Sequence, residues 1–486
     1  MTVTEAGSGV EIRARGWGWR HAGRLAWAVS DLTLRIAPGE RVLLLGPSGS
    51  GKSTLVHALA GVLGEDEGGE SRGELLVDGR PVMEARGRVG LVLQDPDSQV
   101  VLARVGDDVA FGCENLGLPR DEIWRRVGAA LDAVGLDLPL AQPTSVLSGG
   151  QKQRLALAGV LAMRPGLVLL DEPTANLDPL GVIEVRDAVE RTIAASGATL
   201  VVIEHRVAVW KDIVDRVIVI DPAGGILADG SPQQVLQSQG ERLSREGVWV
   251  PGFPPARPKR RAVPSFEFRP LLKAADLVVG RNRDVPVASG INLTVSGGRS
   301  TVVSGPNGSG KSTLALTLAG LLPAVAGCIE ASDELRHGAG QRPIRWRSRE
   351  LLTRIGTVFQ DPEHQLLTTS VRAELAVGPS ALGLGRVEIA DRVDHLLDRL
   401  RLTSLAAANP FTLSGGEKRR LSVATVLATQ PEVLVLDEPT FGQDSRTWAE
   451  LVALLAELLD AGKAVVSVTH DLDFIAALGD DRVVLA

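Results

Sequence analysis

Two glycine-rich stretches of this 486-residue chain have the residue types and spacing that bind phosphate groups. GPSGSGKST at 46–54 stands between the apolar run RVLLL and the helix-like KSTLVHALAG, and GPNGSGKST at 305–313 has the same context. Glycines let backbone N–H groups approach phosphate oxygens, the lysine reaches the terminal phosphates, and the serine hydroxyl is a ligand for Mg²⁺. We therefore predict two phosphate loops, formed by Gly46, Gly49, Gly51, Lys52, Ser53 and Thr54, and by Gly305, Gly308, Gly310, Lys311, Ser312 and Thr313.

A pair of neighbouring carboxylates follows a buried apolar strand in each half of the chain. LVLLDEP contains Asp171 and Glu172, and VLVLDEP contains Asp437 and Glu438. Beside a phosphate loop the aspartate suits the Mg²⁺ shell, and the glutamate, facing the other way, can orient or deprotonate an attacking water. We predict the aspartates as metal ligands and the glutamates as catalytic residues; a turn or a helix cap is the alternative for such a pair alone.

Glutamine and histidine end further strand-like runs. Gln94 and Gln360 each follow an apolar run and precede Asp-Pro. We predict that both bind the nucleotide and the metal, or the water on the metal, with a plain turn as the alternative. His205 and His470 end the runs VVIEH and VSVTH, and we predict that both are catalytic, with hydrogen bonds to a γ-phosphate. A lone histidine at a strand end is more often a core residue, but its repetition favours the functional interpretation.

A further phosphate-binding element is predicted at LSGG, which occurs at 147–150 and again at 413–416. Each stretch opens a helix-like segment, and the free N–H groups at a helix N-terminus bind anions. Since each phosphate loop already precedes a helix of its own, this second anion site needs a separate explanation. The residues concerned are Ser148, Gly149, Gly150, Ser414, Gly415 and Gly416.

The motifs follow one another in the same order in both halves, which indicates two homologous domains. Runs such as RVLLLG and EVLVLD lack polar alternation, as is typical of strands covered on both faces. The segments between the glutamines and the LSGG stretches are helical in pattern. We predict an α/β fold of two P-loop NTPase domains in tandem, each a mixed sheet core with an inserted α-helical subdomain, over 1–240 and 269–486 with a Pro/Arg-rich linker over 241–268.

Composition and charge exclude several classes of protein. The chain is 44% hydrophobic and 23% charged, the balance of an ordinary globular protein. Its apolar runs are shorter than the roughly 18 residues of a membrane helix, and its first residues lack a signal-peptide pattern, so we expect a cytoplasmic protein. The net charge of −7 argues against nucleic acid as the main partner. Cys113 and Cys328 are expected to be free buried thiols, and PKRR at 258–261 to be solvated rather than bound to lipid head groups or RNA.

The ordered set of phosphate loop, glutamine loop, LSGG signature, Asp-Glu-Pro box and histidine resembles the ATP-binding cassette (ABC) ATPases over nearly all of both halves. The resemblance implies two cassettes packed head to tail, so that Ser148 faces the nucleotide on Lys311 and Ser414 the one on Lys52. It also implies that Asp178 and Asp444, in the stretches ANLD and FGQD, lie near the opposite site. ATP and Mg²⁺ would be the cofactors, with two competent ATPase sites.

Members of this family also stack adenine on an aromatic residue before the phosphate loop. In the first half Trp17 or Trp19 can serve, and a core position is the equal alternative. The second half has LVVGRNRD at 277–284 and no aromatic residue there, which puts this contact in doubt.

The stretches QDPDSQVVLARVGDDVAFG (94–112) and QDPEHQLLTTSVRAELAVG (360–378) are similar to the energy-coupling factor ATPases of cobalt and vitamin uptake. This resemblance implies polytopic transmembrane subunits and a substrate-binding membrane subunit as partners, at the cytoplasmic face of the cell membrane. Gln99 and Gln365 would lie close to the transmembrane partner, or else be solvated loop residues. The alternative is a twin-cassette protein acting on ribosomes or translation, which the short linker and the acidic balance disfavour.

Overall fold

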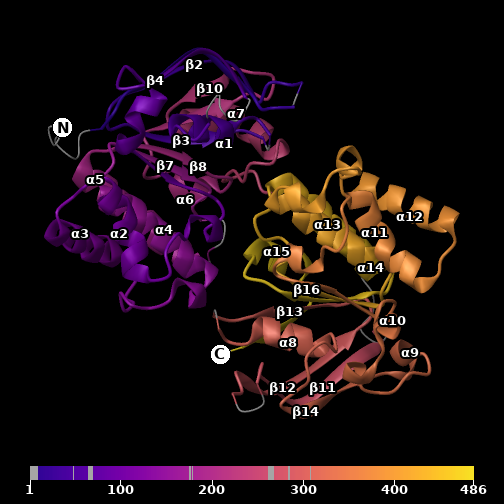
Figure 1. The fold of residues 1–486 in the computed structure, drawn as a ribbon. Coiled ribbons are helices and arrows are strands. Elements are labelled where there is room, and N and C mark those ends of the chain that lie inside the picture. Colours follow the sequence, from indigo (N-terminus) through magenta and orange to yellow (C-terminus); the bar gives the residue numbers. More distant parts are fainter. Residues whose placement is uncertain are drawn as a thin grey trace. The chain divides into compact units, whose positions relative to one another are not determined.

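The structure is a computed structural model, and it describes residues 9–485 except 24, 48, 64–68, 175, 176, 178, 261–267, 283, 284 and 307. The predicted site residue Asp178 therefore lies outside the described residues. The chain forms two compact units: unit 1 comprises residues 1–255 and 444–446, and unit 2 comprises 256–443 and 447–486 (Figure 1). The division after residue 255 falls within the segment that we predicted to be a linker.

The main sheet of unit 1 has six strands in the order β10-β9-β3-β8-β7-β6, all parallel to their neighbours except β10. Strands β7 and β8 are buried at every position, because helices and the second sheet cover both faces. The strands are β3 (Arg41–Leu45), β6 (Val89–Val92), β7 (Leu167–Asp171), β8 (Thr199–Ile203), β9 (Arg216–Ile220) and β10 (Ile226–Gly230).

A smaller antiparallel sheet in unit 1 has the order β2-β1-β4-β5. It comprises β1 (Ile12–Arg20), β2 (Val29–Ile36), β4 (Glu70–Val77) and β5 (Arg80–Pro81). The helices are α1 (Lys52–Leu59), α2 (Val105–Asn115), α3 (Arg120–Ala133), α4 (Gly149–Met163), α5 (Pro179–Ser196), α6 (Val207–Trp210) and α7 (Pro232–Arg245), with short 3₁₀ turns η2 (Val82–Arg88), η3 (Asp97–Gln99) and η4 (Thr144–Val146). Helices α2, α3 and α4 lie together between β6 and β7 in the chain and form the inserted subdomain (Figure 1).

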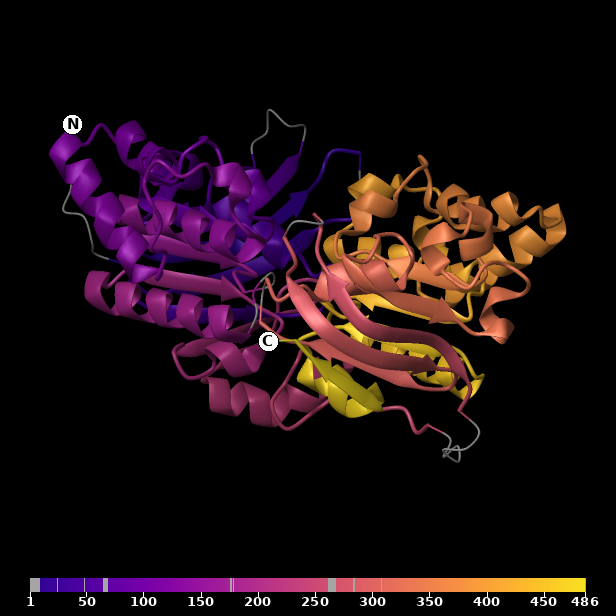
Figure 2. The ribbon, with the colours of Figure 1, turned by 90° about the horizontal axis from the view of Figure 1, so that it is seen from below.

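Unit 2 repeats this plan with a parallel sheet in the order β15-β16-β17-β13-β18 and an antiparallel sheet in the order β12-β11-β14. The strands are β11 (Pro270–Val279), β12 (Ala288–Ser296), β13 (Ser300–Ser304), β14 (Ala326–Ala331), β15 (Ile355–Val358), β16 (Val433–Asp437), β17 (Ala464–Val468) and β18 (Asp481–Val484). Figure 2 shows β11 and β12 as long curved ribbons.

The helices of unit 2 include a second inserted group, α11 (Val371–Leu382), α12 (Arg386–Arg399) and α13 (Gly415–Leu427), which lies away from β11, β12 and β14 (Figure 1). The others are α8 (Lys311–Leu318), α9 (Asp333–Arg336), α10 (Ser348–Leu351), α14 (Ser445–Asp460) and α15 (Leu472–Leu478), with 3₁₀ turns η6 (Pro343–Arg345), η7 (Pro362–Gln365), η8 (Thr403–Leu405) and η9 (Pro410–Thr412). The predicted α/β fold with a helical insertion in each half is confirmed.

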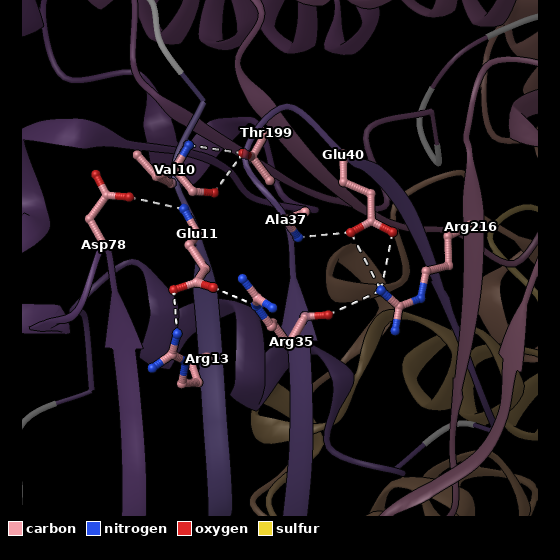
Figure 3. A network of polar contacts seen from close by, with 9 residues as sticks. All are labelled: Val10, Glu11, Arg13, Arg35, Ala37, Glu40, Asp78, Thr199 and Arg216. Atoms are coloured by element: carbon pink, nitrogen blue, oxygen red, sulfur yellow. Dashed lines mark hydrogen bonds and ion pairs between the residues drawn. The ribbon is translucent and has the colours of Figure 1, made fainter.

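A polar network with the buried Thr199 at its centre joins the two sheets of unit 1 at the amino end of its parallel strands (Figure 3). Thr199 has no exposed surface, and its hydroxyl accepts hydrogen bonds from the N–H groups of Val10 (3.0 Å) and Gly39 (2.9 Å) and donates to the Val10 carbonyl (2.7 Å). Nearby, Arg216 Nη1 donates to the Arg35 carbonyl (3.0 Å) and to Glu40 Oε1 (3.1 Å). These contacts fix β1 and β2 against the start of the parallel sheet, whose other end carries the phosphate loop.

The predictions for the PKRR stretch and for the two cysteines can be compared with the structure. Arg260, expected to be solvated, instead donates to Asp480 Oδ2 (2.6 Å) and to the Gly298 carbonyl (2.6 Å), because the carboxylate of unit 2 is within its reach. Cys113 and Cys328 are free thiols, the first buried and the second half-buried, and burial raises the pKa of Cys113. Within the described residues, none of the helices has the length and apolar character needed to cross a membrane.

Candidate functional site

The phosphate loops connect β3 to α1 and β13 to α8. Gly51 and Gly310 cap these helices in the left-handed region, with φ of 87° and 91°. A Cβ on Gly51 would lie 2.3 Å from the Ala28 carbonyl oxygen, so only glycine fits there. The predicted glycines and lysines are therefore brought together as expected, at the carboxyl ends of the central strands.

Each loop lysine lies across its own loop. Lys52 Nζ donates to the carbonyls of Gly46 and Pro47, both at 2.9 Å, and Lys311 Nζ donates to Gly305 (2.9 Å) and Pro306 (2.8 Å). Burial lowers the pKa of Lys52, an effect that the carboxylates of Glu172 and Asp171 oppose. The ammonium group is thus held where phosphate oxygens would reach it.

The predicted metal ligands form a serine–aspartate pair in each unit. Asp171 ends β7 and interacts with Ser53, and Asp437 ends β16 and interacts with Ser312. Burial raises the pKa of both aspartates, and in each case the interaction with the serine lowers the pKa and so opposes this rise. Within the described part of the chain, the buried Oδ1 of Asp437 has no hydrogen-bond partner.

The serine and aspartate oxygens of each unit fit Mg²⁺. In the described residues, no group of three or more His, Cys, Asp or Glu side chains is arranged to hold a metal. Mg²⁺ typically takes one or two protein oxygens and completes its shell with phosphate and water. A hydroxyl, a carboxylate and the unpartnered oxygen of Asp437 suit that requirement.

The two predicted catalytic glutamates share an unusual backbone conformation. Glu172 and Glu438 both have φ of 49°, in the left-handed region that non-glycine residues rarely adopt. Their N–H groups donate to the neighbouring strand, to Ile203 (3.0 Å) and Val468 (2.9 Å). Such conformations cost of order 1–3 kcal/mol and cluster at functional sites. No feature of the sequence predicted this strain.

In unit 1 both carboxylate oxygens of Glu172 are engaged. His205 Nε2 lies 3.0 Å from Oε1, and Gln94 Nε2 donates to Oε2 at 2.7 Å. Burial would raise the pKa of Glu172, but the hydrogen bond from His205 outweighs it and the pKa lies below its usual value. The pKa of His205 is raised, since the hydrogen bond with Glu172 outweighs the opposing effect of burial. Three predicted residues are therefore in direct contact.

In unit 2 the corresponding glutamate has different partners. His470 Nε2 lies 3.9 Å from Glu438 Oε1, beyond hydrogen-bond distance, and Oε2 accepts a hydrogen bond from the Thr469 hydroxyl at 3.1 Å. Burial raises the pKa of Glu438 to about 7. The repeated motifs did not predict this difference. The sequence does differ at the residue before each histidine, which is Glu204 in unit 1 and Thr469 in unit 2.

A pocket of about 430 Å³ in unit 2 brings the predicted residues to one surface. Residues of the phosphate loop line it together with Asp437, Glu438, Gln360 and His470. Arg281, Asn282, Val285 and Val287 also line it, and among the described residues no Phe or Trp side chain does. In unit 1 Trp17 and Trp19 are only 3% and 4% exposed, within the core around β1, so the core alternative holds for both.

The glutamine loops bear on the alternative that Gln99 and Gln365 are solvated loop residues, while their closeness to a transmembrane partner stays a prediction. Gln99 accepts from the Leu93 N–H (2.8 Å) and donates to the Leu91 carbonyl (3.2 Å), and Gln365 makes the matching bonds to Phe359 and Thr357. Neither is a solvated loop residue. Both side-chain amides bind backbone groups of the strand before the loop and of the residue that follows this strand, so they stabilise the conformation of the loop.

The signature serines cap α4 and α13, and both helices begin with a capping box. Ser148 Oγ accepts from the Gln151 N–H (3.3 Å), and Ser414 Oγ accepts from the Glu417 N–H (3.4 Å). Gly149 and Gly415 are exposed, and a Cβ on either would meet nothing within 4 Å. Asp444 precedes α14, and its Oδ1 accepts from the Arg446 N–H (3.1 Å). The helix ends are thus open to an anion, and binding across the two halves stays a prediction.

A buried arginine in the signature helix of unit 2 was not predicted. Arg419 is 5% exposed and donates to three backbone carbonyls, Phe359 (2.9 Å), Gln360 (2.6 Å) and Asp437 (3.4 Å). Burial lowers the pKa of its guanidinium, against the pull of Asp437 and Glu438. Unit 1 has Gln153 at the same place, which donates only to the Leu93 carbonyl at 3.5 Å among its bonds in the described structure.

Comparison with known proteins identifies the family to which the chain belongs. The family described as ABC transporter matches residues 29–175 and 288–441, more than half of the chain. A protein of Bacillus subtilis (strain 168) named "Putative HMP/thiamine import ATP-binding protein YkoD" is 36% identical over 485 residues, covering 94% of this chain and 86% of that protein. A "Putative ABC transporter ATP-binding protein" of Methanosarcina acetivorans is 33% identical, covering 95% of this chain and 82% of that protein.

Solved structures also resemble the chain. The archaeal ribosome recycling factor aABCE1, in complex with the ribosomal stalk protein aP1, matches with a TM-score of 0.64 over 96% of this chain and 87% of that one, at 21% identity. That likeness concerns the fold alone. The cbiO1 protein of Clostridium perfringens, described as part of the ABC transporter complex cbiONQ, is 34% identical over 47% of this chain and 91% of its own, with a TM-score of 0.42.

Proposed function

This chain belongs to the ABC transporter family as an ATP-binding protein with two cassettes, and on that premise we propose that it powers an energy-coupling factor type transporter. It binds and hydrolyses ATP, as members of this family do. We propose uptake of a vitamin or a transition-metal ion as the work that hydrolysis drives. The observation that carries the proposal is the presence of both complete sets of nucleotide-site residues in a chain that matches a thiamine-import relative over nearly its whole length.

The residues of each site have distinct proposed roles. Lys52 and Lys311 hold the terminal phosphates, and the Ser53–Asp171 and Ser312–Asp437 pairs hold Mg²⁺, which when bound neutralises charge that develops on the phosphates. Glu172 and Glu438 orient the attacking water and accept its proton. His205 and His470 hold the γ-phosphate, with the glutamine side chains of Gln94 and Gln360 beside the metal.

The signature helices answer the question of the second anion site. We propose that Ser148 and its glycines bind the γ-phosphate held by Lys311, and that Ser414 serves the nucleotide on Lys52. A few charge-assisted hydrogen bonds of about 1.5–3 kcal/mol each total several kcal/mol, enough to shift an open–closed equilibrium by orders of magnitude. ATP thus closes the two cassettes and hydrolysis releases them.

The cross-site assignment has a direct test. A chain with Glu172→Gln and Glu438→Gln should retain two ATP molecules, and adding Ser148→Arg should reduce this to one. Labelling with a photoreactive ATP analogue should show that the site on Lys311 is the one lost. Loss of labelling at Lys52 instead would contradict the assignment.

The transport proposal is tested by partner and by cargo. The chain should co-purify with a polytopic membrane protein that stimulates its ATPase activity, and the complex in proteoliposomes should take up thiamine, its HMP precursor, Co²⁺ or Ni²⁺ only with ATP. Co-sedimentation with ribosomes, with no membrane protein bound, would favour the rival role in translation and overturn the proposal.

A further inference from the structure

The residue before the catalytic histidine differs between the two sites. It is Glu204 in unit 1 and Thr469 in unit 2. Both are buried, with 5% and 0% of their surface exposed. A buried polar side chain needs hydrogen-bond partners, so the two residues must arrange the neighbouring groups differently.

In unit 1 Glu204 binds the turn that follows the catalytic glutamate. Its carboxylate accepts from the Thr174 hydroxyl, from the Thr174 N–H (3.3 Å) and from the His205 N–H (3.1 Å). It therefore ties the Asp-Glu-Pro-Thr turn to the end of β8. The carboxylate of Glu172 is left to His205 and Gln94, which occupy both of its oxygens.

In unit 2 the corresponding hydrogen bond is made by the residue after the histidine, not by the residue before it. Asp471 Oδ2 accepts from the Thr440 hydroxyl (2.8 Å), the counterpart of Thr174, and from Trp448 Nε1 (2.7 Å). Because Asp471 binds Thr440, the residue before the histidine does not have to bind it. That residue is Thr469.

The Thr469 hydroxyl can have only one role toward the ionised Glu438. Its oxygen accepts a hydrogen bond from the Asp471 N–H at 3.1 Å, and an ionised carboxylate can only accept, so toward the ionised Glu438 the hydroxyl proton is donated to Oε2 at 3.1 Å. Threonine is also stiff about χ1, which fixes the direction of the hydroxyl. One oxygen of the Glu438 carboxylate is thus held by a neutral donor. The other, Oε1, lies 3.9 Å from His470 Nε2, and Glu438 lines the pocket.

We propose that Thr469 is a positioning residue that holds Glu438 for attack by water, and that its replacement by Glu204 in unit 1 makes the two ATPase sites unequal, with unit 2 the faster. The proposal rests on the proposed catalytic role of the glutamates. In unit 1 the carboxylate already binds His205 and Gln94, one on each oxygen, so a water has to bind beside both of them. In unit 2 a water can reach Oε1 with Oε2 already held.

The test is the steady-state ATPase activity of the full chain with Thr469→Val, Thr469→Ser and Ser467→Ala. Valine keeps the shape but removes the donor, so we expect kcat to fall about tenfold with KM within twofold, the rate equivalent of one hydrogen bond to a charged group. Serine should restore most of the loss. Ser467, a buried hydroxyl on β17 without a hydrogen-bond partner in the described structure, is the matched control and should leave kcat unchanged.

Single glutamate variants test the inequality. Glu172→Gln should retain more activity than Glu438→Gln, and equal losses would overturn the order of the sites. Unchanged kcat in Thr469→Val, or an equal fall in Thr469→Ser, would overturn the positioning role. If the double variant Glu172→Gln, Glu438→Gln hydrolyses ATP like the wild type, the proposed function of the glutamates fails instead, so the two failures are distinguishable.

Discussion

Replacing Thr199 by valine should destabilise unit 1 without touching the nucleotide site. The hydroxyl of this fully buried residue serves the N–H groups of Val10 and Gly39 and the carbonyl of Val10 (Figure 3). Valine has the same shape, so packing is kept while three backbone groups lose their partner. At about 1 kcal/mol for each group left unsatisfied, the expected loss is about 3 kcal/mol in the free energy of unfolding.

The assay is urea unfolding followed by tryptophan fluorescence, since Trp17, Trp19 and Trp210 are buried in unit 1. For a domain of this size, about 3 kcal/mol corresponds to a fall of about 6–12 °C in melting temperature. Thr199→Ser keeps the hydroxyl and loses one methyl group, so it should cost only about 1 kcal/mol. Equal stability of the valine and serine variants would refute the reasoning, because it would mean that the hydroxyl does not bind the sheets together.

Three further predictions concern the site. Glu172→Gln together with Glu438→Gln should lower kcat at least about a hundredfold while ATP still binds, measured by phosphate release and by nucleotide retention; an unchanged turnover would exclude both as catalytic residues. In the metal-free chain, the pKa of Glu438 is about 7 against an ordinary 4.5, so the folded state binds the extra proton and stability should be full below about pH 4.5 and fall as pH rises to about 7. Urea unfolding at pH 5 and pH 8 measures this fall, and Glu438→Gln should remove the part of it that Glu438 contributes. Arg419→Met should destabilise unit 2 by about 1–3 kcal/mol through three carbonyls left without their donor, and an equal stability by calorimetry would contradict that role.

The repeated motifs predicted the layout of both sites because backbone geometry at a phosphate loop leaves few choices of residue. Glycine at 51 and 310, lysine at the helix start and a carboxylate at a strand end are each dictated by local sterics and charge, so their order in the sequence was sufficient. The buried strands were predictable for the same reason, since an apolar run without alternation needs cover on both faces.

What the sequence could not reveal depends on contacts between distant segments. The hydrogen bonds from Thr174 to Glu204 and from Thr440 to Asp471 join the segments that follow adjacent strands. The sequence shows an acid before one histidine and after the other, but only the fold shows that both acids bind the corresponding threonine. The left-handed glutamates are also invisible in sequence, because any residue can be forced into that region by its neighbours. Trp17 and Trp19 failed as base-stacking candidates since β1 directs both into the core.

The guanidinium of Arg419 makes one joint of unit 2 stiffer than its counterpart. It connects Phe359 and Gln360, which follow β15, to Asp437 at the end of β16. A displacement of the loop after β15 would therefore also move the strand that bears the predicted metal ligand. Among the described residues Gln153 donates one long hydrogen bond at the matching place, to the Leu93 carbonyl, so this connection is weaker in unit 1. Mechanical strain arriving at the two loops would therefore be transmitted more fully in unit 2 than in unit 1.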